Sequence, residues 1–125
     1  MPIVTDGGEE RYARGRELLA AVDGTAGAEV VESLGDLGRY IVEFAFGEVY
    51  HRPGLSLRDR ELITVAMLAA MGAREPQLDV HLRGALTVGV TRDELRELMI
   101  HLVPYAGFPA AINAMRRLQA VEPHT

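Results

Sequence analysis

Cysteine is absent from this 125-residue sequence, and so is any long apolar run. Without cysteine, disulfide bonds, thiolate metal ligands and cysteine nucleophiles are all excluded. The longest apolar run, residues 65–71, falls far short of the roughly 20 residues that a membrane-spanning helix needs. Residues 1–6 carry neither a basic start nor a signal-type apolar segment, so we expect a cytoplasmic protein that is not bound to a membrane.

Positive charge is also in deficit. The sequence has 13 Lys and Arg against 18 Asp and Glu, which gives a net charge of −5. No global positive field exists to attract a phosphate backbone, so nucleic acid is not an expected partner. The composition, 48% hydrophobic and 25% charged, is that of a globular protein. We expect one domain over residues 1–125, because two smaller cores would both be marginal.

Strand signals are nearly missing, whereas apolar residues recur three and four positions apart, so the fold class is predicted to be all-α. The pattern indicates a bundle of about six helices. The expected segments are a first helix that starts near Asp6 and ends near Gly24, and further helices over residues 28–51 (bent or split near 35–38), 57–71, 76–88, 92–103 and 109–118.

The most specific boundaries are polar caps. Ser56 can cap the helix that ends at Gly72, and Thr91 with Glu94 has the spacing of a capping box. Residues 62–71 are apolar nearly all round, which predicts a fully buried helix. Pro104 and Gly107 are expected to close the helix after Thr91, and Pro109 suits a first turn.

Among the four histidines, His81 has the setting that best suits chemistry. Gly84 and Ala85 lie one turn further on, so small residues leave room for a ligand beside a ring that can pass a proton near neutral pH. A hydrogen-bonded structural histidine is the alternative. His101 reads as a residue at a helix edge or a subunit contact, and His124 belongs to a tail.

Other kinds of site lack support. No H-x-x-x-H, E-x-x-H or H-E-x-x-H spacing occurs, and Asp79 would point away from His81 on a helix, so no metal site is expected. There is no G-x-S-x-G nucleophile elbow. The polar link "GEVYHRPGLSLRDRE", residues 47–61, is either a solvated turn or a place where arginine binds a substrate carboxylate.

Four segments, in order, resemble the carboxymuconolactone decarboxylase family, near its stand-alone γ-carboxymuconolactone decarboxylase branch. They lie within residues 9–118 and read "ERYARGREL", "EFAFGEVYHRPGLSLRDREL", "VAMLAAMG" and "HLRGALTVGVTRDELRELMIHLVPYAGFPAAINAMR". The resemblance implies an alkylhydroperoxidase-D-like helical fold that forms trimers or hexamers. It also implies breakdown of aromatic compounds as the cellular setting.

A second branch of that family, the thiol peroxidases, carries C-x-x-C-x-x-x-H. The corresponding stretch here, "AREPQLDVH", keeps His81 but has neither cysteine and is one residue longer, so thiol peroxidase chemistry is excluded. Glu61, in "REL", resembles the glutamate of the thiol branch. Tyr50, His51, Thr87, Val88 and Ala106 differ from the usual decarboxylase residues at positions that we assign to the pocket lining.

The resemblance implies a decarboxylase that needs no cofactor, because loss of carbon dioxide from γ-carboxymuconolactone leaves an enolate that the lactone carbonyl stabilises. The protein must hold carboxylates, stabilise the oxyanion and deliver a proton to carbon. His81 is the expected proton donor or oxyanion partner, and Glu48 or Glu61 is expected to orient it.

Four residues are expected to bind the substrate, a small carboxylated lactone. Arg52 is the first candidate for the carboxylate anchor, followed by Arg83 and Arg74, and Tyr50 lines the pocket. The alternative is an oligomeric protein of the same fold that binds a small molecule or a partner without catalysis.

Overall fold

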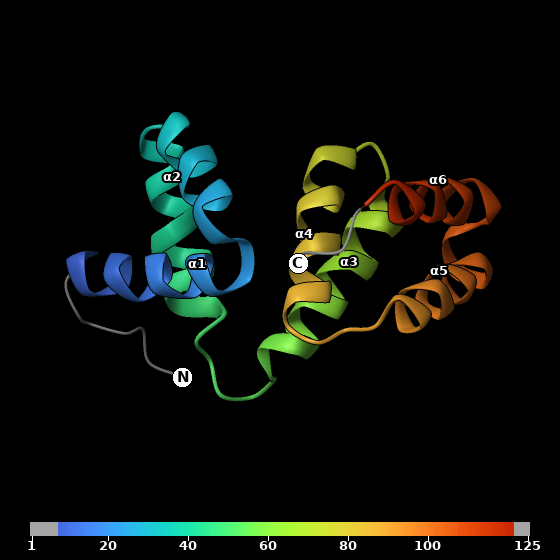
Figure 1. The fold of residues 1–125 in the computed structure, drawn as a ribbon, viewed down its shortest axis with the longest axis horizontal. Helices are drawn as coiled ribbons and strands as arrows, with labels where there is room; N and C mark the ends of the chain where they lie inside the picture. Colours follow the sequence, from blue (N-terminus) through green and yellow to red (C-terminus); the bar gives the residue numbers. More distant parts are fainter. Residues whose placement is uncertain (1–7, 122–125) are drawn as a thin grey trace. The chain divides into compact units, whose positions relative to one another are not determined.

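A computed structural model describes residues 8–121 of the chain (Figure 1). All regular secondary structure among the described residues is helical, which confirms the all-α prediction. The elements are α1 (Gly8–Ser33), α2 (Asp36–Tyr40), the π-helix η1 (Ile41–Val49), α3 (Leu57–Met71), α4 (Glu75–Thr87), α5 (Arg92–Ala106) and α6 (Phe108–Ala120). Asp6 and His124 lie outside the described residues.

The chain divides into two compact units, and the boundary lies between Leu55 and Ser56. The first contains α1, α2 and η1, and the second contains α3 to α6. The expectation of one domain over residues 1–125 therefore stays a prediction, and each unit is described by itself. None of the described helices is long and apolar enough to cross a membrane.

In the first unit, glycines interrupt the helices where the sequence predicts a break. Gly24 lies inside α1 with φ 60° and ψ −150°, a conformation that only glycine adopts without strain, and it kinks the helix there. Gly35, with φ 61°, separates α1 from α2. The apolar spacing did not predict the π-helical segment, in which the amide of Tyr50 donates to the carbonyl of Ala45, five residues back, at 2.8 Å.

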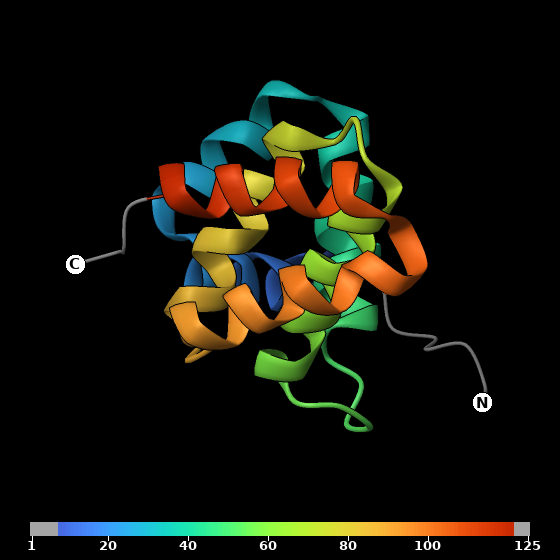
Figure 2. The ribbon, with the colours of Figure 1, turned by 90° about the vertical axis from the view of Figure 1, so that its right-hand side faces the viewer.

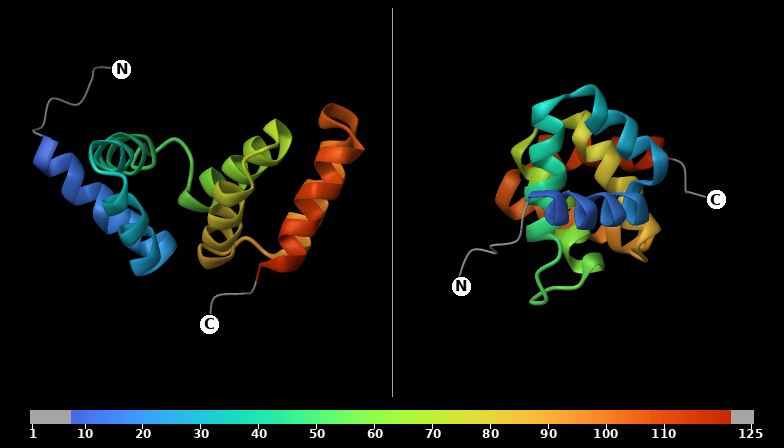
Figure 3. Two further views of the ribbon diagram at one scale, coloured as in Figure 1. Left: turned by 90° about the horizontal axis from the view of Figure 1, so that it is seen from above. Right: turned by 90° about the vertical axis from the view of Figure 1, so that its left-hand side faces the viewer.

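The core of the first unit lies where α1 packs across η1. The right panel of Figure 3 shows the two helices crossing, with α1 in blue and η1 in teal to green. Leu19, Val42 and Phe46 are buried there. The backbones approach closely, since a Cβ atom on Gly15 would lie only 2.0 Å from the carbonyl oxygen of Val42.

In the second unit, two helical hairpins form two layers. The left panel of Figure 3 shows α3 with α4 in one layer and α5 with α6 in the other, and α3 packs against both helices of the second layer. The core between them is aliphatic and includes Val65, Leu82, Leu95, Met99 and Leu118. Gly72, with φ 71°, ends α3 as the sequence predicts.

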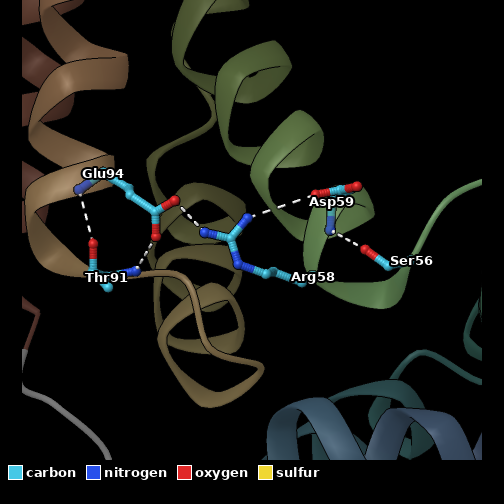
Figure 4. A network of polar contacts seen from close by, with 5 residues as sticks. All are labelled: Ser56, Arg58, Asp59, Thr91 and Glu94. Atoms are coloured by element: carbon cyan, nitrogen blue, oxygen red, sulfur yellow. Dashed lines mark hydrogen bonds and ion pairs between the residues drawn. The ribbon is translucent and has the colours of Figure 1, made fainter.

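Polar caps fix the starts of α3 and α5, and both predicted caps are confirmed (Figure 4). The Ser56 hydroxyl accepts from the amide of Asp59 at 3.0 Å. Thr91 and Glu94 form the reciprocal capping box, with bonds of 3.0 and 2.9 Å. Arg58, in the first turn of α3, donates to the Glu94 carboxylate, so one ion pair joins the two capped helix starts.

Two details differ from expectation. The second unit leaves Ile63, Met67 and Met71 uncovered, so the prediction that residues 62–71 form a fully buried helix is wrong. An apolar helix is buried only on the sides where neighbouring helices pack, and α4 to α6 do not surround α3. Pro104 lies inside α5 and does not end it; the helix ends at Gly107, whose amide donates to the carbonyl of Val103 at 3.1 Å.

Candidate functional site

The second unit brings two of the predicted residues into direct contact. Glu61 lies on the second turn of α3 and His81 lies in the middle of α4. The Nδ1 atom of His81 is 2.9 Å from Oε2 of Glu61, which is a normal hydrogen-bond distance. Because α3 and α4 are antiparallel neighbours joined by the turn at Gly72, residues 20 positions apart meet across them.

Glu61 is fully buried, and it is the only charged residue in the described part of the chain that is. Its second carboxylate oxygen, Oε1, is also buried and has no hydrogen-bond partner among residues 8–121. A buried carboxylate is costly to hold in an apolar core unless its oxygens are bonded. A group kept under those conditions is typical of a functional site.

His81 lies at the edge of this core, with 20% of its side chain exposed. When the Glu61 carboxylate is ionised it can only accept, so the Nδ1–H of His81 donates to it. The proton is then held on Nδ1, and Nε2 is the nitrogen left to exchange a proton with another molecule. Nothing in the described part of the chain hydrogen-bonds to Nε2.

A second ion pair fixes the helix that carries His81. The Asp79 carboxylate accepts from Nε of Arg117 at 2.8 Å and from its terminal nitrogen at 2.5 Å, a two-point contact between α4 and α6. Asp79 thus points away from His81, as the sequence predicts. Sequence reasoning missed the Arg117 partner, since 38 residues separate the two and no spacing rule connects them.

The small residues beside His81 are buried. Ala85 is fully buried in the core cluster and Gly84 is buried as well. Their burial lets neighbouring helices pack closely on α4, and the expectation that they leave room for a ligand beside His81 stays a prediction. His101 is exposed on α5 and lies against Tyr105 with ring centroids 5.6 Å apart, in agreement with a position at a helix edge.

Three of the predicted residues belong to the first unit. Glu48 lies on η1, with Oε2 3.9 Å from Arg11 and a buried Oε1 that finds no hydrogen-bond partner within residues 8–121. Tyr50 stacks on Phe46 with ring centroids 5.0 Å apart, and Arg52 is exposed just after η1. Of the predicted catalytic residues, Glu61 and His81 lie in the same unit and contact each other, whereas Glu48 lies in the other unit.

The remaining predicted arginines lie on or beside α4. Arg74 precedes the helix, is exposed, and donates to the carbonyl of Gly72 at 2.9 Å. Arg83 is half-buried one turn after Asp79, so it lies on the Asp79 face of α4 and not on the His81 face. Neither arginine forms an ion pair within the part of the chain that the structure describes. Within the same residues, no cluster of three or more His, Asp or Glu side chains could hold a metal ion.

Comparison with known proteins finds a family model and several relatives that match the chain. The model of the carboxymuconolactone decarboxylase family matches residues 35–120. The 4-carboxymuconolactone decarboxylase of Acinetobacter baylyi is 42% identical over 118 residues, which cover 90% of this chain and 87% of that protein.

Two further relatives match over shorter stretches. The nitrosuccinic acid decarboxylase npaB of Metarhizium robertsii is 41% identical over 75 residues, 60% of this chain and 52% of that protein. An uncharacterised 15.0 kDa protein of Paracoccus denitrificans is 34% identical over 82 residues, 65% of this chain and 61% of that protein. With a family match over most of its length and a relative of this identity over nearly all of it, the chain belongs to the carboxymuconolactone decarboxylase family.

Proposed function

We propose that the protein removes one carboxylate as carbon dioxide from γ-carboxymuconolactone or a related small carboxylated lactone, without a cofactor. The protein is a carboxy-lyase of the decarboxylase type, since relatives of 41% and 42% identity are named decarboxylases. The observation that carries the proposal is the contact between His81 and the buried carboxylate of Glu61.

The chemistry explains why no cofactor is needed. When the carbon–carbon bond to the departing carboxylate breaks, its electron pair moves through the ring double bond to the lactone carbonyl and forms an enolate. Nitrosuccinic acid, which the fungal relative's name gives as its substrate, has a nitro group that could take up an electron pair in the same way. In both molecules the substrate itself stabilises the negative charge, so the protein's task is to position it and protonate it.

His81 supplies that proton in our proposal. Its Nε2–H protonates the enolate carbon after carbon dioxide has left, and Nε2 regains a proton from solvent. Glu61 acts through His81: it keeps the Nδ1 proton in place and fixes the ring orientation. Glu61 is thus a positioning residue, and the proton transfer itself belongs to His81.

Substrate carboxylates need a cation, and Arg52 stays our first candidate, with Arg83 and Arg74 next and Tyr50 as a lining residue. An arginine fork suits a carboxylate because it can donate two parallel hydrogen bonds. Glu48 is the alternative orienting carboxylate. We also propose that the chain works as a homo-oligomer, a trimer or hexamer, as the family resemblance implies.

The test is to incubate the purified protein with γ-carboxymuconolactone, and separately with nitrosuccinic acid, and to follow release of carbon dioxide. We expect release from the lactone, and a loss of kcat of about 100-fold or more in His81→Ala. His101→Ala is the matched control, since it removes an exposed imidazole from α5, and it should keep full activity.

Each other result has a distinct meaning. Full activity in His81→Ala would refute the role of the histidine while leaving the reaction intact. Release from nitrosuccinic acid alone would refute the lactone as substrate. Failure to release carbon dioxide from either acid would favour the non-catalytic binding protein.

A further inference from the structure

An apolar strip runs along the outside of the second unit, over α5 and its neighbours. Figure 2 shows α5 and α6 side by side at the front of the view. A groove of about 450 Å³ lies on them, lined by Ile100, Val103, Ile112 and Met115 among others. Ile100 is 58% exposed and Ile112 is 50% exposed. The second unit therefore leaves these large aliphatic side chains uncovered.

A second groove continues the strip on the other side of α5. It has a volume of about 710 Å³, its lining includes Leu62, Ile63 and Leu98, and it shares Ile100 with the first groove. Its lining also includes acidic side chains, among them Glu97. Exposed apolar side chains with charged side chains among them are typical of a protein interface.

Two opposite charges flank the strip. Glu97 is exposed on α5 and lines the second groove, and Arg116 is exposed on α6 and lines the first groove. Within residues 8–121 neither side chain forms an ion pair, whereas the neighbouring Asp93 pairs with Arg96 at 2.6 Å. The strip thus carries one negative and one positive side chain that the second unit itself does not neutralise.

The two charges also lie at the same level. Helices α5 and α6 are joined at Gly107, the C-cap of the first and the N-cap of the second, and Figure 2 shows them running back along one another. Glu97 is ten residues before that turn and Arg116 is nine residues after it. At about 1.5 Å of rise per residue, these separations are about 15 and 13.5 Å along the two helices. The apolar pair Ile100 and Met115 lies at a similar level, one turn or less closer to Gly107.

We propose that this face binds a second copy of the chain, with the two-fold axis running along the groove between α5 and α6. Rotation about such an axis swaps the two sides of the groove but leaves each residue at the same position along the helices. Helix α5 of one copy therefore faces α6 of the other. Glu97 of each copy then faces Arg116 of the other copy, and Ile100 faces Met115. A two-fold contact requires a self-complementary surface, and opposite charges at one level on two neighbouring helices provide it.

The inference is independent of the proposed catalytic activity. The family resemblance implies a trimer or hexamer but assigns no surface, and a two-fold contact at this face would join chains in pairs within a hexamer. The opposite charges across the contact favour a second copy of the chain over another apolar surface. A partner that placed a like charge opposite Glu97 or Arg116 would be repelled.

Charge reversal tests the pairing directly. Glu97→Arg alone, or Arg116→Glu alone, places like charges opposite each other twice, and each should weaken association at this face about tenfold or more. An equimolar mixture of the two variants should restore association, because every cross-copy pair is again of opposite sign. Sedimentation velocity over a concentration series measures both effects. Gln77→Arg, at an exposed position of α4, is the control that adds positive charge elsewhere.

Cysteine crosslinking gives a second readout, since the native chain has no cysteine. In a mixture of Glu97→Cys and Arg116→Cys chains, any disulfide formed on mild oxidation joins two copies. We expect the mixture to form the mixed dimer faster than a mixture of Gln77→Cys and Arg116→Cys. Equal rates in the two mixtures would overturn the proposal, and so would a wild-type monomer or single reversals that leave association unchanged.

Discussion

The Nδ1 atom of His81 lies 2.9 Å from Oε2 of Glu61, and it links a half-buried imidazole on α4 to a fully buried carboxylate on α3. The geometry leaves Nε2 as the nitrogen that can exchange a proton. The Asp79–Arg117 pair holds α4 against α6 on a different face of the same helix. The helix that carries the imidazole is thereby fixed from two directions.

The first prediction concerns Glu61. Glu61→Gln keeps the size of the side chain and an oxygen that can accept from Nδ1–H, but it removes the negative charge. We expect kcat to fall about tenfold while KM changes less than twofold, since the residue acts through His81 and does not hold the substrate. Steady-state kinetics of carbon dioxide release measure both constants.

A purely structural role for Glu61 would show a different pattern. In that case Glu61→Gln would lower the free energy of unfolding but leave kcat of the folded enzyme unchanged. Urea unfolding of the same preparation separates the two cases. Glu29→Gln, which changes an exposed acid on α1, is the control and should affect neither quantity.

The second prediction is a pH dependence set by Glu94. The side-chain hydrogen bond from Arg58, followed by the backbone hydrogen bond from Thr91, lowers the pKa of Glu94 from 4.5 to about 2. A carboxylate with a lowered pKa in the folded state stabilises it above pH 4.5, and that contribution is lost as pH falls through about 2. The native protein should therefore exceed Glu94→Gln in stability by a constant margin between pH 5 and 7.

Acid unfolding curves at several pH values measure this margin. It should shrink below pH 4.5 and vanish below about pH 2, and added salt should reduce it because the pair is exposed. Glu17→Gln, at an exposed site on α1, controls for the loss of one acidic group. A margin that stays constant down to pH 2 would show that Glu94 and Arg58 do not interact as described.

The third prediction concerns the close contact of α1 with η1. A Cβ atom on Gly15 would lie 2.0 Å from the carbonyl oxygen of Val42 and 2.9 Å from its Cγ1 atom. Gly15→Ala must push the helices apart, so we expect the free energy of unfolding to fall by about 1–3 kcal/mol. Urea unfolding followed by circular dichroism measures the change.

Gly54→Ala is the matched control for that experiment. Nothing lies within 4 Å of a Cβ atom built on Gly54, so its stability should change by less than about 0.5 kcal/mol. Equal effects of the two substitutions would contradict the packing of α1 on η1.

Helix boundaries that depend on local chemistry could be predicted from the sequence. The start of α3 at Ser56 and its end at Gly72, and the capping box of Thr91 and Glu94, are set by side chains and glycines within a few residues of the boundary. The break at Gly24 is local in the same sense. The π-helical form of η1 was not predictable in this way, since apolar spacing does not reveal that the backbone hydrogen bonds reach five residues back and not four.

Contacts between side chains on different helices could not be predicted, because they depend on how the helices pack and not on the spacing of residues in the sequence. His81 was a candidate from its sequence setting, and Glu61 and Glu48 were equal candidates to orient it. The structure places Glu61 beside His81 within the second unit, whereas Glu48 lies in the first unit near Arg11. The substrate-binding arginines and Tyr50 stay predictions, because the structure brings none of them into a contact that tests the role.

The sequence by itself determined that the protein is all-α, that it cannot use thiol chemistry, and where most helices begin and end. These properties follow from residue types and from interactions over one or two turns. The tertiary structure decided that Glu61 is buried against His81 and that Arg117 forms an ion pair with Asp79. It also decided that Ile100 and Ile112 stay uncovered. Each of these depends on how α3 to α6 pack in space, where residues 20 to 38 positions apart become neighbours.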